Sequence, residues 1–149
     1  VEYAQYVENY YGTPKAYVNE QLKAGKNVIL EIELQGALKI KEQYPDAVLM
    51  FITAPNAREI KNRLVGRGTE SMEVIEARLN RANEESKGIE NYDYLVVNDI
   101  LDDTVALVDR LIQNERDGRS FANEEQRVLN HMNFINEMRV ELKDFAEGE

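Results

Sequence analysis

The chain has 149 residues, of which 43% are hydrophobic and 31% are charged, as in ordinary water-soluble domains. Its formal net charge of −10 argues against broad binding to DNA or RNA, because phosphate backbones attract basic surfaces. No apolar run approaches the roughly 18 residues that cross a membrane, and no signal-peptide pattern is present. Cysteine is absent, which excludes disulfides and thiolate zinc sites. We expect a cytoplasmic protein without nucleic-acid or membrane partners.

The first 26 residues are expected to form a hairpin followed by a helix. Residues 2–7 alternate in the period-two manner of a strand, and residues 9–12 are typical of a turn and a short returning strand. Thr13 and Pro14 predict the start of a helix that ends at Gly25. The inner face of this helix is expected to carry Tyr17, Val18 and Leu22.

Apolar segments and helical patterns alternate along the next part of the chain. This order is typical of a parallel α/β sheet, whose ligands bind at the carboxyl ends of the strands. The strands are expected at residues 28–34, 48–52 and 94–97. The helices are expected at about 35–44, 55–64, 72–90 and from a cap at Asp102 or Asp103 onward. The residues that fall at these strand ends are Glu31, Glu33, Ala54-Pro55 and Asn98-Asp99. They predict that the site lies at this edge of the sheet.

Three arginines lie on or between two of these helices, at positions 63, 67 and 78. Gly66 and Gly68 flank Arg67 and supply the backbone freedom for a segment that closes over a ligand. Arginine suits a polyphosphate because its planar fork pairs with phosphate oxygens and keeps its charge. The alternative is that these side chains form helix-surface ion pairs, such as Glu59 with Arg63 or Glu85 with Arg81.

The pattern changes after about residue 114. Residues 117–120 are typical of a linker. They are followed by an apolar stripe at helical spacing, formed by Val128, Leu129, Met132, Ile135, Met138, Leu142 and Phe145. We expect an amphipathic helix that docks on its own domain or on a partner chain, which would allow a homo-oligomer.

Several of these segments together resemble the guanylate kinases. Residues 2–13 look like the guanine-recognition hairpin of that family and residues 29–37 like its central strand. Residues 63–70 resemble its arginine lid, and residues 92–99 its final strand. The likeness follows the same order over about 115 residues, and several motifs at matching spacing are specific as a set.

The resemblance implies a domain division. It gives a guanylate-kinase-like domain over 1–116, with a hairpin remnant at 1–26, a core at 27–56 and 91–116, and a lid at 57–90. Residues 117–149 form a linker and an added helix. The implied fold is an α/β parallel-sheet core of the P-loop kinases that lacks its first strand and P-loop.

The resemblance also implies roles for individual residues. Glu2, Tyr11, Thr13 and Glu33 would bind GMP, and Glu31 would lie near magnesium bound with ATP. Arg63, Arg67 and Arg78 would clamp the transferring phosphoryl group. Arg63, Arg67 and Asn98 would contact ATP, with Asn98 beside its base. The implied reaction is ATP-dependent phosphorylation of GMP to GDP in purine metabolism.

One motif of the family is not found. The run G-x-x-G-x-G-K-[ST], whose amides and lysine hold the ATP phosphates, does not occur in these 149 residues. We therefore expect negligible activity from this chain alone. Two alternatives are a non-catalytic guanylate-kinase-like module that binds peptides in the GMP site, and a kinase for another nucleoside monophosphate.

Overall fold

The computed structural model describes the backbone of residues 2–6, 9–66 and 71–146, and the side chains of 14–66 and 71–145. It contains two compact units, residues 1–49 and 50–149, which we describe separately. The fold is mixed α/β and mostly helical, with one small parallel sheet in the second unit. Residues 117–149 belong to the second unit. None of the helices described is long and apolar enough to cross a membrane.

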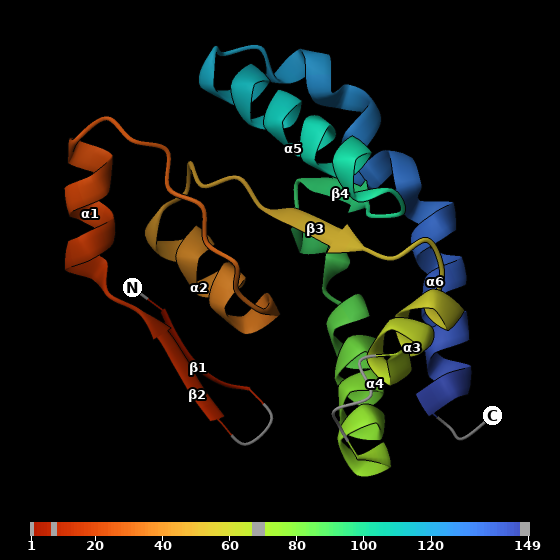
Figure 1. Cartoon of the computed structure of the whole chain (residues 1–149). Helices are drawn as coiled ribbons and strands as arrows, with labels where there is room; N and C mark the ends of the chain where they lie inside the picture. Colours follow the sequence, from red (N-terminus) through yellow and green to blue (C-terminus); the bar gives the residue numbers. More distant parts are fainter. Residues whose placement is uncertain (1, 7–8, 67–70, 147–149) are drawn as a thin grey trace. The chain divides into compact units, whose positions relative to one another are not determined.

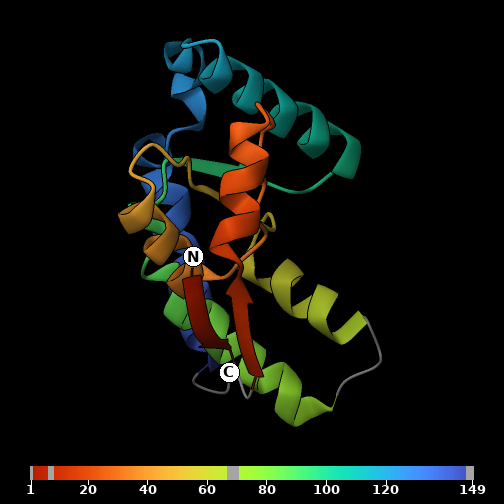
Figure 2. The same ribbon diagram turned by 90° about the vertical axis from the view of Figure 1, so that its left-hand side faces the viewer.

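The first unit begins with an antiparallel hairpin that leads directly into a helix (Figures 1 and 2). Glu2 pairs with Thr13 and Tyr6 with Asn9 in its register. Gly25 has a φ of 77°, and the amides of Gly25 and Lys26 donate to the preceding helical turn, which ends that helix in a Schellman motif. The elements are β1 (Glu2–Tyr6), β2 (Asn9–Thr13), α1 (Lys15–Lys23) and α2 (Leu34–Gln43).

The strand predicted at residues 28–34 does not form. Residues 26–33 carry no strand pairing, and α2 starts at Leu34. A β-branched run becomes a strand only when a neighbour satisfies its backbone groups. The described strands pair only as β1 with β2 and β3 with β4, so this segment has no such neighbour.

The predicted inner face of α1 is also mostly wrong. Val18 is buried, but Tyr17 and Leu22 are 62% and 45% exposed. A hydrogen bond joins the helix to the end of α2, where Tyr44 donates its hydroxyl hydrogen to Asn19 Oδ1 at 2.6 Å.

In the second unit, two parallel strands support four long helices. Met50 is in register with Tyr94, and Thr53 with Val97. A glycine in the left-handed conformation again ends a helix, here Gly118 with a φ of 70°. The elements are β3 (Met50–Thr53), α3 (Ala57–Gly66), α4 (Met72–Ser86), η1 (Ile89–Asn91), β4 (Tyr94–Val97), α5 (Leu101–Arg116), η2 (Ser120–Gln126), η3 (Val128–His131) and α6 (Met132–Ala146).

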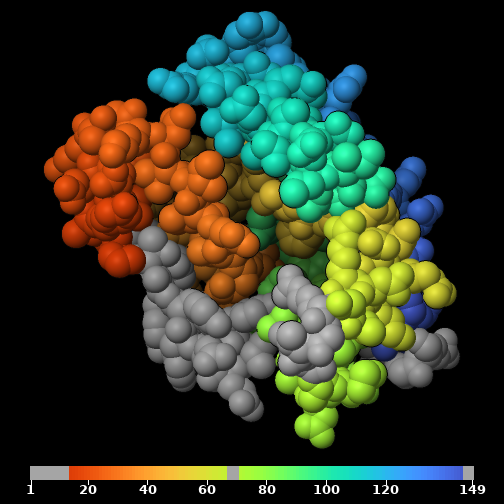
Figure 3. Space-filling view, viewed as in Figure 1, coloured from red at the N-terminus to blue at the C-terminus, as the bar shows by residue number. Residues whose placement is uncertain are grey.

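Strand β4 is buried on both faces, as its continuous apolar run predicts. Tyr94 and Val96 pack against Leu111 of α5. Leu95 points the other way, into a cluster with Ile89 and with Ile135 of α6. Both layers are visible around the strand pair in Figure 1. The opposite, outward side of α5 remains open to solvent (teal in Figure 3), with Leu101 and Val105 exposed.

Two strand and helix boundaries differ from the expectation. β3 lies at Met50–Thr53 instead of 48–52, and Ile52 is 53% exposed, so this strand is not covered on both faces. α5 starts at Leu101, so Asp102 and Asp103 lie in its first turn and do not cap it. Their carboxylates still stabilise the N-terminus of α5, because a negative charge interacts favourably with the positive end of the helix dipole.

The C-terminal stripe packs within the chain, but its helix starts later than predicted. α6 begins at Met132, whereas Val128 belongs to η3 and Leu129 is 78% exposed. The amide of Val128 donates to the carbonyl of Asp93, and Arg127 forms a bridge with Tyr94. This edge pairing holds Arg127 in an extended conformation, so the helical turns begin only after it.

A buried polar network ties β4 to α5 and η2. The hydroxyl of Tyr94 donates to Glu115 and accepts a hydrogen bond from Asn123 Nδ2 at 3.3 Å. Asn123 Nδ2 also donates to the carbonyl of Leu111 at 3.1 Å, and Asn114 donates to Asn123 Oδ1 at 2.8 Å. Tyr94 and Asn123 are 0% and 1% exposed. A buried network of this kind is costly to leave incomplete.

Replacing Tyr94 with phenylalanine should lower the free energy of unfolding by about 1 to 2 kcal/mol, because Glu115 and Asn123 lose a buried partner. Urea denaturation at neutral pH measures this change. Tyr17→Phe is the matched control, since Tyr17 is 62% exposed, and should leave stability within about 0.5 kcal/mol. Equal effects of the two substitutions would contradict the assignment.

The ionisation of Tyr94 also predicts how the stability of the chain depends on pH in the alkaline range. Burial, followed by the bond to Glu115, raises the pKa of Tyr94 above its ordinary value of 10.0. The unfolded chain then loses the hydroxyl proton of Tyr94 at lower pH than the folded chain. The stabilisation of the folded chain by the Tyr94 hydroxyl is therefore complete below pH 10 and is lost as the pH rises through the higher pKa of the folded state. The stability difference between wild type and Tyr94→Phe should therefore shrink above pH 10.

Candidate functional site

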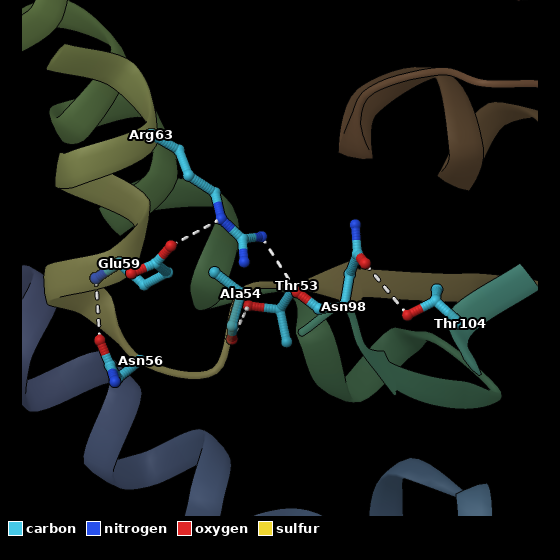
Figure 4. Close-up of polar contacts among 7 residues, drawn as sticks. All are labelled: Thr53, Ala54, Asn56, Glu59, Arg63, Asn98 and Thr104. Carbon is cyan, nitrogen blue, oxygen red and sulfur yellow. Dashed lines mark hydrogen bonds and ion pairs between the residues drawn. The ribbon is translucent and has the colours of Figure 1, made fainter. Parts of the chain in front are cut away.

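The candidate site is the carboxyl edge of the β3–β4 pair (Figure 4). The amide of Asn98 donates to the carbonyl of Thr53 at 2.7 Å, which carries the strand pairing one residue beyond β4. Thr53 and Ala54 are buried at the end of β3. The structure thus brings the predicted Ala54 and Asn98 to the same edge, where parallel sheets bind ligands.

The side chain of Asn98 is held in place from α5. Thr104 donates its hydroxyl hydrogen to Asn98 Oδ1 at 3.0 Å or to the carbonyl of Ile100 at 3.2 Å. Thr104 is 7% exposed and was not predicted from the sequence. The available signal was its place three and seven residues before Leu107 and Leu111, on the buried side of the helix. Since the amide oxygen accepts from Thr104, both Nδ2 hydrogens of Asn98 point elsewhere.

Arg63 reaches this edge from α3, as Figure 4 shows. Its Nη1 donates to the carbonyl of Asn98 at 3.0 Å, and its Nε pairs with Glu59 at 3.0 Å. The start of α3 is fixed because Asn56 Oδ1 accepts from the amide of Glu59 at 2.8 Å. The alternative of a helix-surface ion pair is therefore realised for Arg63, together with a contact to the strand edge. Arg63 remains 40% exposed, so its pairing with Glu59 contributes little stability.

The other arginines are placed less fully. Arg78 lies half-buried on α4, whose first turn is capped by Ser71 Oγ accepting from the amide of Val74 at 3.3 Å. Arg67 lies outside the described residues. Arg81 pairs with Glu85 at 3.1 Å, as the surface-pair alternative predicts. Of the three, Arg63 is joined to the strand edge by a hydrogen bond.

In the first unit, Glu33 is the most informative acidic residue. It occupies the position before α2, and its Oε1 is buried without a hydrogen-bond partner. A buried carboxylate oxygen requires a donor to offset its lost hydration. Glu31 is exposed in the unpaired segment. The side chains of Glu2, Tyr11 and Thr13 lie outside those described, although all three residues belong to the hairpin backbone.

A cavity of about 220 Å³ lies next to the site, between β3, α3, α4 and α6. Its lining is mostly apolar and includes Ile52, Ile60, Ala82 and Met138. Of the predicted site residues, Ala54 lines it, whereas Glu33, Arg63 and Asn98 do not. An apolar cavity does not suit phosphate. Within the described ranges, no cluster of three or more acidic or histidine side chains is placed to hold a metal ion.

Comparison with known proteins gives a consistent match. A sequence model of the family described as Guanylate kinase matches residues 1–115. The guanylate kinase of Lactococcus lactis is 53% identical over 115 residues, covering 77% of this chain and 56% of that protein. Those of Streptococcus thermophilus and Listeria monocytogenes are 54% and 47% identical over the same length, with 55% and 56% of each covered. The chain therefore spans about half the length of the curated relatives it matches.

Removing the Thr104 hydroxyl should leave the side-chain oxygen of Asn98 without its hydrogen bond from α5. Thr104→Val and Asn98→Ala should each lower the free energy of unfolding by about 1 kcal/mol, because each removes one partner of the same hydrogen bond. In a double-mutant cycle measured by denaturation, the coupling energy should be about 1 kcal/mol. Additive effects would mean that the two side chains do not support each other.

Proposed function

Because the chain belongs to the guanylate kinase family, we propose that it forms part of an enzyme that phosphorylates GMP to GDP with ATP and magnesium. The observation that carries this proposal is the Arg63 guanidinium at the carboxyl edge of the parallel strands, 3.0 Å from the carbonyl of Asn98. This edge is where nucleotides bind in such sheets, and a guanidinium fork matches phosphate oxygens.

Arg63 keeps donors for a phosphate ligand. A guanidinium carries five N–H groups, and the contacts to Glu59 and Asn98 use two of them. In phosphoryl transfer the protein mainly positions the reactants and neutralises charge on the oxygens of the transferred group. We assign that role to Arg63, Arg67 and Arg78, which would converge on the phosphates when the lid at 57–90 closes.

We assign binding of the guanine base of GMP, the phosphoryl acceptor, to the first unit. The unpartnered Oε1 of Glu33 supports a contact with a hydrogen-bond donor of the ligand. Guanine offers N1–H and N2–H₂ donors, whereas adenine lacks this pair, so carboxylates at Glu2 and Glu33 would discriminate against adenine. Thr13 would add a hydroxyl contact to the base, and Tyr11 one to the GMP phosphate.

ATP would bind toward the strand edge of the second unit. Magnesium generally keeps several waters and is held by substrate phosphates with one or two carboxylates, which fits an exposed carboxylate such as Glu31 better than a protein cage. Bound magnesium would neutralise charge on the phosphates. Asn98 would use its Nδ2 hydrogens toward the ATP base, because its Oδ1 already accepts from Thr104.

Arg63 should be required for phosphoryl transfer. In a hybrid that adds the uncovered part of the Lactococcus lactis enzyme to residues 1–149, Arg63→Ala should lower kcat by about 100-fold. Arg58→Ala on the same helix is the matched control and should leave kcat unchanged, because Arg58 is exposed. ADP formation in a coupled assay gives both values. The 149-residue chain alone should give no detectable rate; an ordinary kinase rate from it would refute that expectation.

Glu33 should be required for GMP affinity. In the same hybrid, Glu33→Gln should raise KM for GMP by about tenfold while KM for ATP stays constant, because the base loses its charged acceptor. Glu42→Gln, an exposed change on α2, is the control. Titrating the unmodified chain separately with GMP and with phosphopeptides distinguishes the non-catalytic alternative, which requires peptide binding without GMP binding.

A further inference from the structure

Helix α6 lies outside the family match and contacts two different parts of the second unit. Its first half belongs to the strand core, where Ile135 packs with Ile89 and Leu95. Its second half packs on the lid helices, where Met138 and Leu142 cover Ala57. Figures 1 and 2 show α6 (blue) running alongside α4 (green). One rigid helix therefore joins the core to the lid.

The first junction of the lid with the core is at the start of α3. There the amide of Ala57 donates to Glu141 Oε2 of α6 at 3.2 Å. Ala57 is 0% exposed, so this amide has no access to water. A carboxylate at a helix N-terminus also interacts favourably with the helix dipole. Further along α3, Lys61 lies 5.2 Å from the ring centre of Phe145 in a cation–π contact.

The second junction is at the end of α4, and Arg139 of α6 holds it. Its Nε donates to the carbonyl of Ser86, the last residue of α4, at 2.9 Å. Its Nη2 lies 2.5 Å from Glu90 Oε1, on the turn that leads back to the core. A cation at a helix C-terminus is again the favourable arrangement. Arg139 and Glu141 thus fasten both ends of the lid.

We propose that α6 is a strut that fixes the base of the lid, residues 57–61 and 82–90, on the strand core. Rotation of α3 and α4 as one body would break both polar junctions. It would also separate Met138 and Leu142 from Ala57. This inference concerns closure of the lid and so rests on the proposed function, but its tests need no nucleotide.

Hydrogen–deuterium exchange of the full 149-residue chain tests the strut. Glu141→Gln should speed exchange of residues 57–64 by about tenfold, and Arg139→Gln should have the same effect on residues 80–90. The reason is that each substitution removes the charged partner of the hydrogen bond at one junction. Residues 94–97 and 101–116 should exchange at the wild-type rate. Glu137→Gln, an exposed change on α6, and Arg110→Gln, an exposed change on α5, are the matched controls and should alter nothing.

Two results would overturn the proposal. Unchanged exchange in the lid would show that the polar junctions do not restrain it. Equal acceleration across β4 and α5 would show that α6 only stabilises the unit as a whole. Because no nucleotide is added, failure here is distinct from failure of the kinase proposal, which would appear as a hybrid without GMP phosphorylation.

A distance measurement provides a second test. The chain contains no cysteine, so spin labels attach only at introduced sites. Labels at Arg58→Cys on α3 and Asp109→Cys on α5, both exposed, report the base of the lid against the core. The distance distribution should be narrow in the otherwise wild-type chain and broader when Glu141→Gln and Arg139→Gln are combined. Identical distributions would contradict the strut.

Discussion

The second unit depends on one constraint, the burial of β4 on both faces. Tyr94 and Val96 are 0% exposed against α5, and Leu95 is 1% exposed against the opposite cluster with α6. β3 pairs with one edge of this strand, and the other edge bonds with residues 127–128. With every side of β4 occupied, the helices before and after it have fixed positions around its end.

The candidate site follows from that arrangement. Asn98 comes directly after β4, its backbone is held by Thr53 and its side chain by Thr104. Arg63 then reaches the same edge from α3, while Glu59 orients the guanidinium from one turn earlier. Each contact is modest by itself. Their convergence on the end of a buried strand is what makes the edge a defined anion-binding candidate.

Part of this arrangement was predictable from sequence. The apolar run at 94–97 predicted β4 because a strand buried on both faces needs no polar alternation. The motifs that resemble guanylate kinases predicted the family, and the match over residues 1–115 confirms it. The segment at 28–34 shows the limit of such reasoning. Its β-branched residues favour a strand, but strand formation also requires a partner, which the residue pattern does not supply.

The sequence by itself determined the family and the local elements, because apolar periodicity, helix-ending glycines and motif spacing act over a few residues. Only the tertiary structure decided which neighbours meet: Thr104 with Asn98, Arg63 with the strand edge, and Glu141 and Arg139 with the two ends of the lid. The apolar stripe of α6 predicted packing but not its target, since burial is non-directional. Polar side chains then selected the target, because a buried hydrogen bond requires one particular partner at one distance.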